Sequence, residues 1–358
     1  MKKDDKTGDL LQFLDDDLRE EYDRYRAPDA GYDVMRSIVL EKQRTRIRRR
    51  AMSPVERRRD VTREDIERSI RANADAAEHI AFVHTVLALC GFPYRRPPEG
   101  ATEYRQTYGR NSLVVQAGHV LDPATGAMVK PGLPYGPKAR LLMLHICTQA
   151  LRQNSSTIRV ADTLSAFIRE LGYEVSGGKN GTIGLFKEQM TRLAAANMTI
   201  GLFQEDRAHT IQTHPIKEFC VWLPQQPRKP VLWKTELTLE QEFFASLKRF
   251  ALPIDIRVMK AFAHSARQID IILWLDYRVK RLNKPRFLLT WPMLKEQFGA
   301  EIGEMSKFRQ ALRDDLKRIT EVFPKLPARL GEDGLTIERR PEGVFHLPKR
   351  GAAPRLGG

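Results

Sequence analysis

The chain has 358 residues, and its hydrophobic content of 42% can supply the cores of two or three domains. Its 60 basic residues outnumber the 45 acidic ones, and the formal net charge of +15 favours a polyanionic partner. No apolar run approaches the roughly 18 residues that a membrane-spanning helix needs, and the first residues lack the apolar core of a signal peptide. We therefore expect a soluble, cytoplasmic protein that makes no membrane contact.

The three cysteines, Cys90, Cys147 and Cys220, are far apart in the sequence and odd in number. They form no CxxC pair, so the pattern indicates neither a disulfide framework nor a zinc site. We expect buried thiols in a reducing compartment.

Residues 1–60 are dense in charge and poor in regularly spaced apolar positions, which predicts a charged, flexible or partly helical arm. Residues 41–50 hold five arginines. These arginines could bind phosphates or simply be solvated, and the sequence leaves both interpretations open.

Residues 61–134 are predicted to form a helical and turn-rich N-terminal extension. A helical pattern starts near Thr62 and continues through apolar positions on one face, at Ile80, Val83, His84 and Leu87. Residues 113–116 alternate as a strand does, so we also expect a small β-element here.

Residues 135–224 follow the order of a first winged helix-turn-helix domain. The spacing of apolar and turn residues predicts a first helix (residues 140–153), a short strand (158–160) and a second helix (162–171). A polar glycine-rich loop (176–181), a third helix (182–196) and a two-stranded wing (198–213) follow. This domain is called the first block below. Residues 217–223 can add a third strand to that wing. In such domains the third helix is the one that enters a DNA groove.

Residues 225–249 contain the stretch QQPRKP and are predicted to be a linker. Residues 250–348 then repeat the order of the first block. In this second block the pattern predicts a long helix (residues 256–282), a strand (287–289) and a short helix capped by Thr290 (290–299). A further helix (305–320) and a hairpin (335–347) follow. Residues 349–358 are predicted to be a flexible tail. The duplication favours an α+β fold with tandem winged helix-turn-helix domains behind a charged helical N-terminal extension.

The polar faces of the two third helices predict where duplex DNA binds. In the first block the candidate residues are Lys179, Asn180, Thr182, Lys187, Thr191 and Arg192. In the second block they are Ser306, Lys307, Arg309, Gln310, Arg313 and Lys317. For Lys179, Asn180 and Thr182 the alternative is a turn whose polar side chains are only solvated.

No pattern of catalytic residues accompanies these elements. The glycine-rich loop lacks the GxxxxGK[ST] order of a phosphate loop, and the sequence holds no HExxH or GxSxG motif. No HxH pair lies beside a nucleophilic tyrosine, as a strand-nicking initiator would need. We therefore expect no enzyme, no catalytic residue, no cofactor and no metal site.

Four ordered sequence motifs within residues 80–220 resemble the plasmid-encoded RepA-type replication initiators. They are Gly91-Phe92-Pro93-Tyr94, Gly132-Leu133-Pro134-Tyr135-Gly136-Pro137-Lys138-Ala139-Arg140-Leu141, Asp162-Thr163-Leu164-Ser165-Ala166-Phe167 and Gly178-Lys179-Asn180-Gly181-Thr182. The resemblance implies binding to repeated double-stranded DNA sites, or iterons, at a plasmid origin. It also implies recruitment of host replication proteins such as a helicase or the host initiator.

Two other functions and the state of assembly stay open. A transcriptional repressor of a plasmid promoter would use the same folds, whereas a nicking enzyme is disfavoured by the missing catalytic set. Initiators of this type often change between a repressing dimer and an initiating monomer, so a homodimer is a possible partner. Phe219, Val221 and Trp222 could form its surface or cover the core of their own domain.

Overall fold

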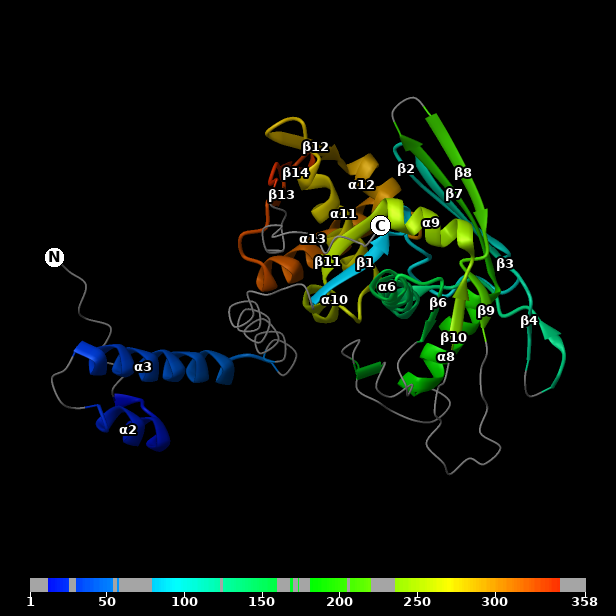
Figure 1. Ribbon diagram of the computed structural model, residues 1–358. Helices are drawn as coiled ribbons and strands as arrows, with labels where there is room; N and C mark the ends of the chain where they lie inside the picture. Colours follow the sequence, from blue (N-terminus) through cyan, green and yellow to red (C-terminus); the bar gives the residue numbers. More distant parts are fainter. Residues whose placement is uncertain are drawn as a thin grey trace. The chain divides into compact units, whose positions relative to one another are not determined.

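The computed structural model describes residues 12–25, 30–53, 57, 79–122, 125–159, 168–169, 173, 181–204, 207–219 and 236–341. The chain forms two compact units, Met1–Ser69 and Ile70–Gly358, which are treated separately below (Figure 1).

The first unit contains a helical hairpin of α2 (Asp16–Asp23) and α3 (Ala30–Arg50). Its small core consists of Leu14, Leu18, Val39 and Leu40, with Tyr22 packed against it. The segment that composition predicts to be a flexible or partly helical arm thus holds two packed helices. The apolar positions are few because only one narrow side of each helix is covered.

Helices and antiparallel strands make up the second unit, so its content is α+β (Figure 1). Its described helices are α5 (Thr85–Cys90), α6 (Gly136–Gln153), α8 (Thr182–Ala195), α9 (Gln241–Phe250), α10 (Ile256–Ala261), α11 (Ala266–Lys280), α12 (Trp291–Phe298) and α13 (Met305–Val322). Its described strands are β1 (Ile80–His84), β2 (Glu103–Tyr108), β3 (Asn111–Ala117), β4 (Val120–Leu121), β5 (Met128–Val129), β6 (Thr157–Arg159), β7 (Ala196–Gln204), β8 (Arg207–Thr213), β9 (Ile216–Phe219), β10 (Glu236–Leu239), β11 (Ala251–Asp255), β12 (Arg286–Thr290), β13 (Ala328–Leu330) and β14 (Gly334–Glu338).

The helical face predicted through Ile80 and His84 is wrong, because these residues form strand β1. β1 pairs antiparallel with β11, which lies far along the chain. Only α5 follows as a helix, and its first turn is capped by the His84 ring, whose Nδ1 accepts the amide of Val86 at 3.2 Å. A distant strand partner has overridden a local pattern that fits either structure.

The predicted wing strands of the first block form a hairpin, but the hairpin joins a larger sheet. β7 and β8 extend β3 and β2, in the order β2-β3-β7-β8. They do not pair with β6. Strand β6 instead pairs with β10, and β10 pairs with β9. Part of the predicted linker is therefore strand β10, and α9 follows it.

The second block contains the predicted strand and both following helices, with two differences in its flanks. The single helix expected at residues 256–282 is two helices, α10 and α11, because Ser265 begins a new helix and its Oγ accepts the amide of Gln268 at 3.4 Å. The predicted partner of β14 at residues 344–347 lies outside the described residues. Both edges of β14 are already occupied, by β12 and β13, so the hairpin is formed by β13 and β14.

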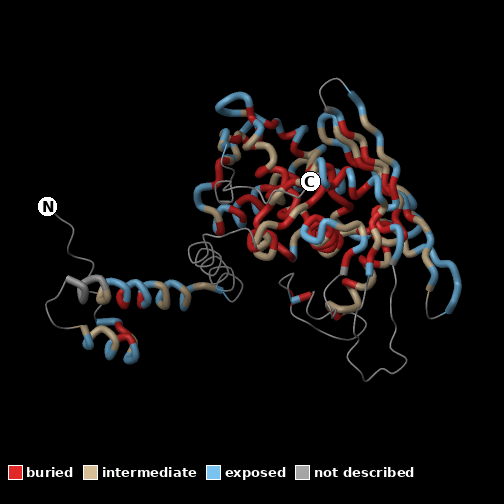
Figure 2. Tube along the Cα trace, viewed as in Figure 1, coloured by how far each residue is buried: buried red, intermediate tan, exposed pale blue. Residues whose placement is uncertain are grey.

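The core of the second unit is built around α6 and α11, which are largely buried along their length (Figure 2). α6 packs against β1, α8 and α11, and α11 also contacts α5 and α13. Helices that are apolar nearly all round are typical of such central positions. Within the described residues, no helix combines the length and the apolar character needed to cross a membrane.

Candidate nucleic-acid interface

Helix α13 turns a polar stripe toward solvent in the second block. Ser306, Gln310, Arg313 and Lys317 follow one another at three- and four-residue spacing, so they share one face, and all four are exposed. The opposite face is buried and consists of Phe308, Leu312, Leu316 and Ile319. Gln310, Arg313 and Lys317 face outward as predicted, whereas Arg309 is half-buried and its Nε is covered. The contact of this helix with DNA stays a prediction.

Lys307 and Gln310 make only short local contacts on α13. The Lys307 ammonium lies 2.7 Å from Glu304, and the Gln310 amide donates to Asp314 at 3.0 Å. Glu304 lies three residues before Lys307, at the N-cap of α13, and Asp314 lies four residues after Gln310 on the same helix. Exposed pairs of this kind are weak and are exchanged readily for another acceptor.

Trp291, the first residue of α12, connects three parts of the second block. Its indole Nε1 donates to the carbonyl of Glu332 at 2.7 Å, and its backbone amide donates to the carbonyl of Asp333 at 3.2 Å. These bonds attach the β13–β14 turn to the start of α12. The Phe308 ring meets the indole edge-on from α13, with the ring centroids 6.4 Å apart.

Two arginines of α13 lie over the Trp291 ring. The guanidinium carbon of Arg309 is 5.0 Å from the ring centroid, and that of Arg313 is 5.7 Å away. A cation over an indole gains roughly 0.5–2 kcal/mol, depending on its exposure. The contact restricts both side chains before any ligand arrives, so less side-chain entropy is lost when an anion binds.

Neither arginine has a neutralising partner within the described part of the chain. Among the described residues, the Nε of Arg309 is buried without a hydrogen bond, and no carboxylate lies at ion-pair distance from either guanidinium. Two positive groups four residues apart are thus held on one ring. Guanidinium groups bind phosphate oxygens and guanine edges through paired hydrogen bonds, so this arrangement suits a nucleic acid.

Helix α8 of the first block is far less open. Thr182 begins the helix, and Lys187 and Thr191 are half-buried, with the Thr191 hydroxyl donating to the Lys187 carbonyl at 3.0 Å. Lys179 and Asn180 lie outside the described residues. Gly181 is the N-cap of the helix, as the glycine-rich loop predicts.

Arg192 is not on an outward face, which corrects the expectation from helical spacing. It is 6% exposed, and its guanidinium donates to the carbonyl of Leu133 at 3.0 Å and to Glu188 at 2.9 and 3.1 Å. The segment that precedes α6 covers this side of α8, and the amide of Tyr135 donates to Gln189 there at 2.8 Å. A periodicity of one helix cannot reveal a loop that packs over it.

A buried ion pair joins the two blocks. Arg140 of α6 donates to both carboxylate oxygens of Asp270 on α11 at 2.7 Å, and both side chains are less than a tenth exposed. Burial disfavours the charge on Arg140, but the adjacent Asp270 more than compensates and raises the pKa of the guanidinium. The side chain therefore stays charged and paired.

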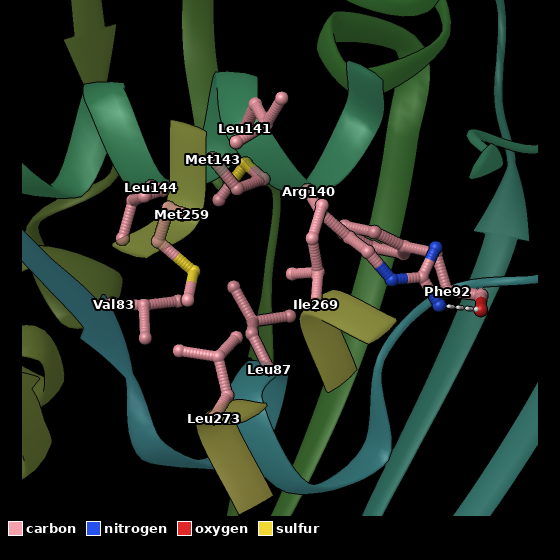
Figure 3. Close-up of a pocket in the computed structure, with 10 residues that line it drawn as sticks. All are labelled: Val83, Leu87, Phe92, Arg140, Leu141, Met143, Leu144, Met259, Ile269 and Leu273. Carbon is pink, nitrogen blue, oxygen red and sulfur yellow. Dashed lines mark hydrogen bonds between the residues drawn. The ribbon is translucent and has the colours of Figure 1, made fainter. Parts of the chain in front are cut away.

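Two of the four sequence motifs that carry the family resemblance, at residues 91–94 and 132–141, meet at this pair. Arg140 also donates to the carbonyls of Phe92, Pro93 and Gly136, and the Phe92 bond is visible in Figure 3. The same close-up shows a small apolar pocket beside Arg140, with room for about one water molecule.

Gly91 is required at this junction by its conformation and by space. Its φ of +59° lies in the left-handed region, and a Cβ atom there would lie 2.7 Å from Asp270. The motif residues before and within α6 thus build the joint between the two blocks.

Trp291, Arg140 and Asp270 were not identified from the sequence. A signal existed for the last two, since each is a charge within an apolar helical stretch, and such charges are rarely buried unless they are paired. Trp291 gives no comparable signal. A tryptophan in the first turn of a helix is an ordinary core residue until its neighbours are known.

Comparisons with known proteins found a family and a solved structure to which the chain is similar. The family described as plasmid encoded RepA protein matches residues 133–292, whereas no curated protein sequence matches the chain. A crystal structure of RctB domains 2–3 is similar over 71% of this chain and 96% of its own, at 10% identity and a TM-score of 0.45. A TM-score this low does not establish a common fold. The resemblance expected from the four sequence motifs is confirmed for residues 133–292, which match the family described as plasmid encoded RepA protein.

Proposed function

We propose that this protein initiates plasmid replication by binding repeated double-stranded DNA sites at an origin through α13 of its second block. The observation that carries the proposal is the pair of unneutralised guanidinium groups, Arg309 and Arg313, over the Trp291 ring. Ser306, Gln310 and Lys317 continue the same exposed face. Together they offer donors for phosphates and for base edges along one helix.

The second block supports the proposal by its order of elements. α11, β12, α12, α13 and the β13–β14 hairpin succeed one another as in a winged helix, and the sheet order is β12-β14-β13. In that arrangement α13 is the helix that enters a major groove. The start of α12 and the hairpin turn, both held by Trp291, would then flank the DNA backbone.

The first block is proposed to be a second winged helix with a different wing from the one expected. Its sheet order, β6-β10-β9, repeats the first-third-second order of β12-β14-β13. By this correspondence β9 and β10 are the strands of the wing, and the connection between them lies outside the described residues. The β7–β8 hairpin is then an insertion between α8 and the wing.

Replacement of Arg313 by alanine tests the DNA contact. Binding to the DNA that flanks the gene, measured by gel shift and footprinting, should weaken by about 1–3 kcal/mol if the side chain reads a guanine. Arg318→Ala is the matched control, because Arg318 is an exposed arginine on the same helix but lies off the stripe. Equal binding by the two variants would refute the assigned role of α13.

The footprint also separates the open alternatives. Direct repeats protected in that DNA support an initiator, whereas one palindrome without origin activity would support a repressor. A strand-cleavage assay on the same DNA should give no product, because we propose that the protein is not an enzyme. Neutralisation of about 6–10 phosphates by two blocks should make binding fall by orders of magnitude between low and moderate salt.

Host replication proteins and a second copy of the chain are the proposed protein partners. Sedimentation of the free protein and of the protein on one repeat would reveal a change from dimer to monomer. Of the proposed dimer residues, Val221 and Trp222 lie outside the described residues, and the Phe219 side chain is likewise not described. Double replacement of Lys179 and Asn180 by alanine, with folding checked by thermal melting, tests the start of α8 as a DNA contact.

A further inference from the structure

The two helices of the first unit carry opposite charges. Helix α2 holds Asp16 and Asp17 in its first turn and follows Asp15, whereas the last turn of α3 is Arg48, Arg49 and Arg50. The hairpin therefore places an acidic helix beside an arginine-rich one. Besides its small apolar core, the hairpin is bridged by ion pairs between these charges.

Three basic side chains of α3 are bound by carboxylates of the α2 segment. Arg46 donates to both oxygens of Asp17 at 2.7 Å and to Asp15 at 3.1 Å. Arg50 lies 2.9 Å from Asp15. Further along the hairpin, the ammonium of Lys42 lies 2.6 Å from Glu21.

These bonds are of the kind that a guanidinium group makes with a phosphate. A carboxylate and a phosphate both present two oxygens to the planar fork of an arginine, so one can replace the other. Lys42, Arg46 and Arg50 are spaced four residues apart, which puts them on one face of α3 at steps of about 6 Å. Such a row can follow the phosphates of a nucleic-acid backbone.

The acidic helix can be displaced from this row. The side chains of Lys42, Arg46 and Arg50 are 48%, 40% and 67% exposed, so solvent and ligands reach them although they are paired. Exposed ion pairs are weak and screened by salt. A DNA backbone offers many phosphates and releases counterions when it binds, which makes it a strong competitor.

We propose that α3 is a separate surface for duplex DNA and that the α2 carboxylates occupy its phosphate sites in the free protein. DNA binding opens the hairpin, or moves α2 away from the row of Lys42, Arg46 and Arg50. The surface recognises the backbone and not the sequence, because the carboxylates that occupy it stand in for phosphates. It thereby adds sequence-independent affinity to the contact made by α13.

The test compares two double variants of the full-length protein on a random-sequence DNA duplex. D15N/D17N removes the carboxylates that bind Arg46 and Arg50, while D16N/E20Q makes the same change in charge at exposed residues that form no ion pair within the described residues. We expect D15N/D17N to bind the duplex about 3- to 10-fold more tightly than D16N/E20Q at low salt. R46Q/R50Q should bind more weakly than the wild type. Equal affinity of the two acidic double variants would overturn the proposal.

Hydrogen exchange of the wild-type protein gives a second measurement that needs no variant. Addition of the random duplex should speed exchange in residues 16–23 and should slow or leave unchanged exchange in residues 42–50. Unchanged exchange in α2 at saturating DNA would show that the helix is not displaced and would also overturn the proposal. Either failure leaves the role of α13 intact, because that role is measured with R313A on the flanking DNA.

Discussion

The two blocks of the second unit share a sheet order but differ in what their third helix offers to a ligand. In the second block α13 exposes Gln310, Arg313 and Lys317 along one stripe. In the first block Arg192, which helical spacing predicts to face outward, is buried against Leu133 and Glu188. A repeated order of elements therefore does not imply a repeated binding surface.

The difference has a structural cause. The segment before α6 covers one side of α8, and the β7–β8 hairpin continues directly from its end into the sheet with β2 and β3. α13 has no such cover among the described residues, because a short connection leads from it to β13. The first block is thus built into the body of the unit, while the second block leaves its third helix open.

The largest effect is expected where the blocks are joined. Asp270→Ala would leave the Arg140 charge buried without its partner, and breaking such a pair costs about 3–5 kcal/mol of unfolding free energy. Urea unfolding followed by circular dichroism measures the loss. Asp333→Asn, an exposed aspartate in the β13–β14 turn, should change stability little.

A double variant checks the cause. Arg140→Met with Asp270→Leu removes both charges and keeps apolar volume, so it should recover much of the stability. If the single variant lost less than about 1 kcal/mol, the pair would not be the joint that we describe.

Acid should weaken the surroundings of the first block before the second. Burial lowers the pKa of His84 to about 4, and burial with the charges of Arg152 and Lys260 lowers that of His145 to about 3. Residues 266–338 contain no histidine. Below the ordinary pKa near 6.5 the unfolded chain takes up a proton that the folded chain does not, so stability is present above about pH 6.5 and falls as pH falls toward 4.

The slope of this loss can be measured. Each histidine lowers the free energy of unfolding by roughly 1.4 kcal/mol for each pH unit that the pH falls in that window. His84→Asn retains an acceptor for the Val86 amide and should remove about half of the slope between pH 6.5 and 5. An unaltered slope in the His84 variant would assign the acid sensitivity elsewhere.

The smallest effect concerns single lysines on the two third helices. Lys317→Ala on exposed α13 should reduce the salt dependence of DNA binding by about one phosphate contact. Lys187→Ala on half-buried α8 should change it less. Gel shifts over a series of salt concentrations provide the slopes, and a larger change for Lys187 would reverse the ranking of the two helices.

Much of the local structure could be predicted from spacing. Helices α6, α8, α12 and α13 and strands β3, β7, β8 and β12 lie where the sequence places them, because their apolar period is carried within each segment. The errors fall where a distant segment intervenes. β1 was predicted as helix because its partner β11 is remote, and β10 was taken for a linker because its neighbours β6 and β9 precede it by many residues.

The sequence by itself determined the positive charge, the helix-rich repeated order and the polar stripe of α13, since these depend on residue type and local period. Only the tertiary structure decided which polar residues remain accessible. It buried Arg192, paired Arg140 with Asp270, and placed Arg309 and Arg313 on Trp291. The physical reason is that exposure and ion pairing depend on which remote segments pack together, and helical spacing contains no information about that.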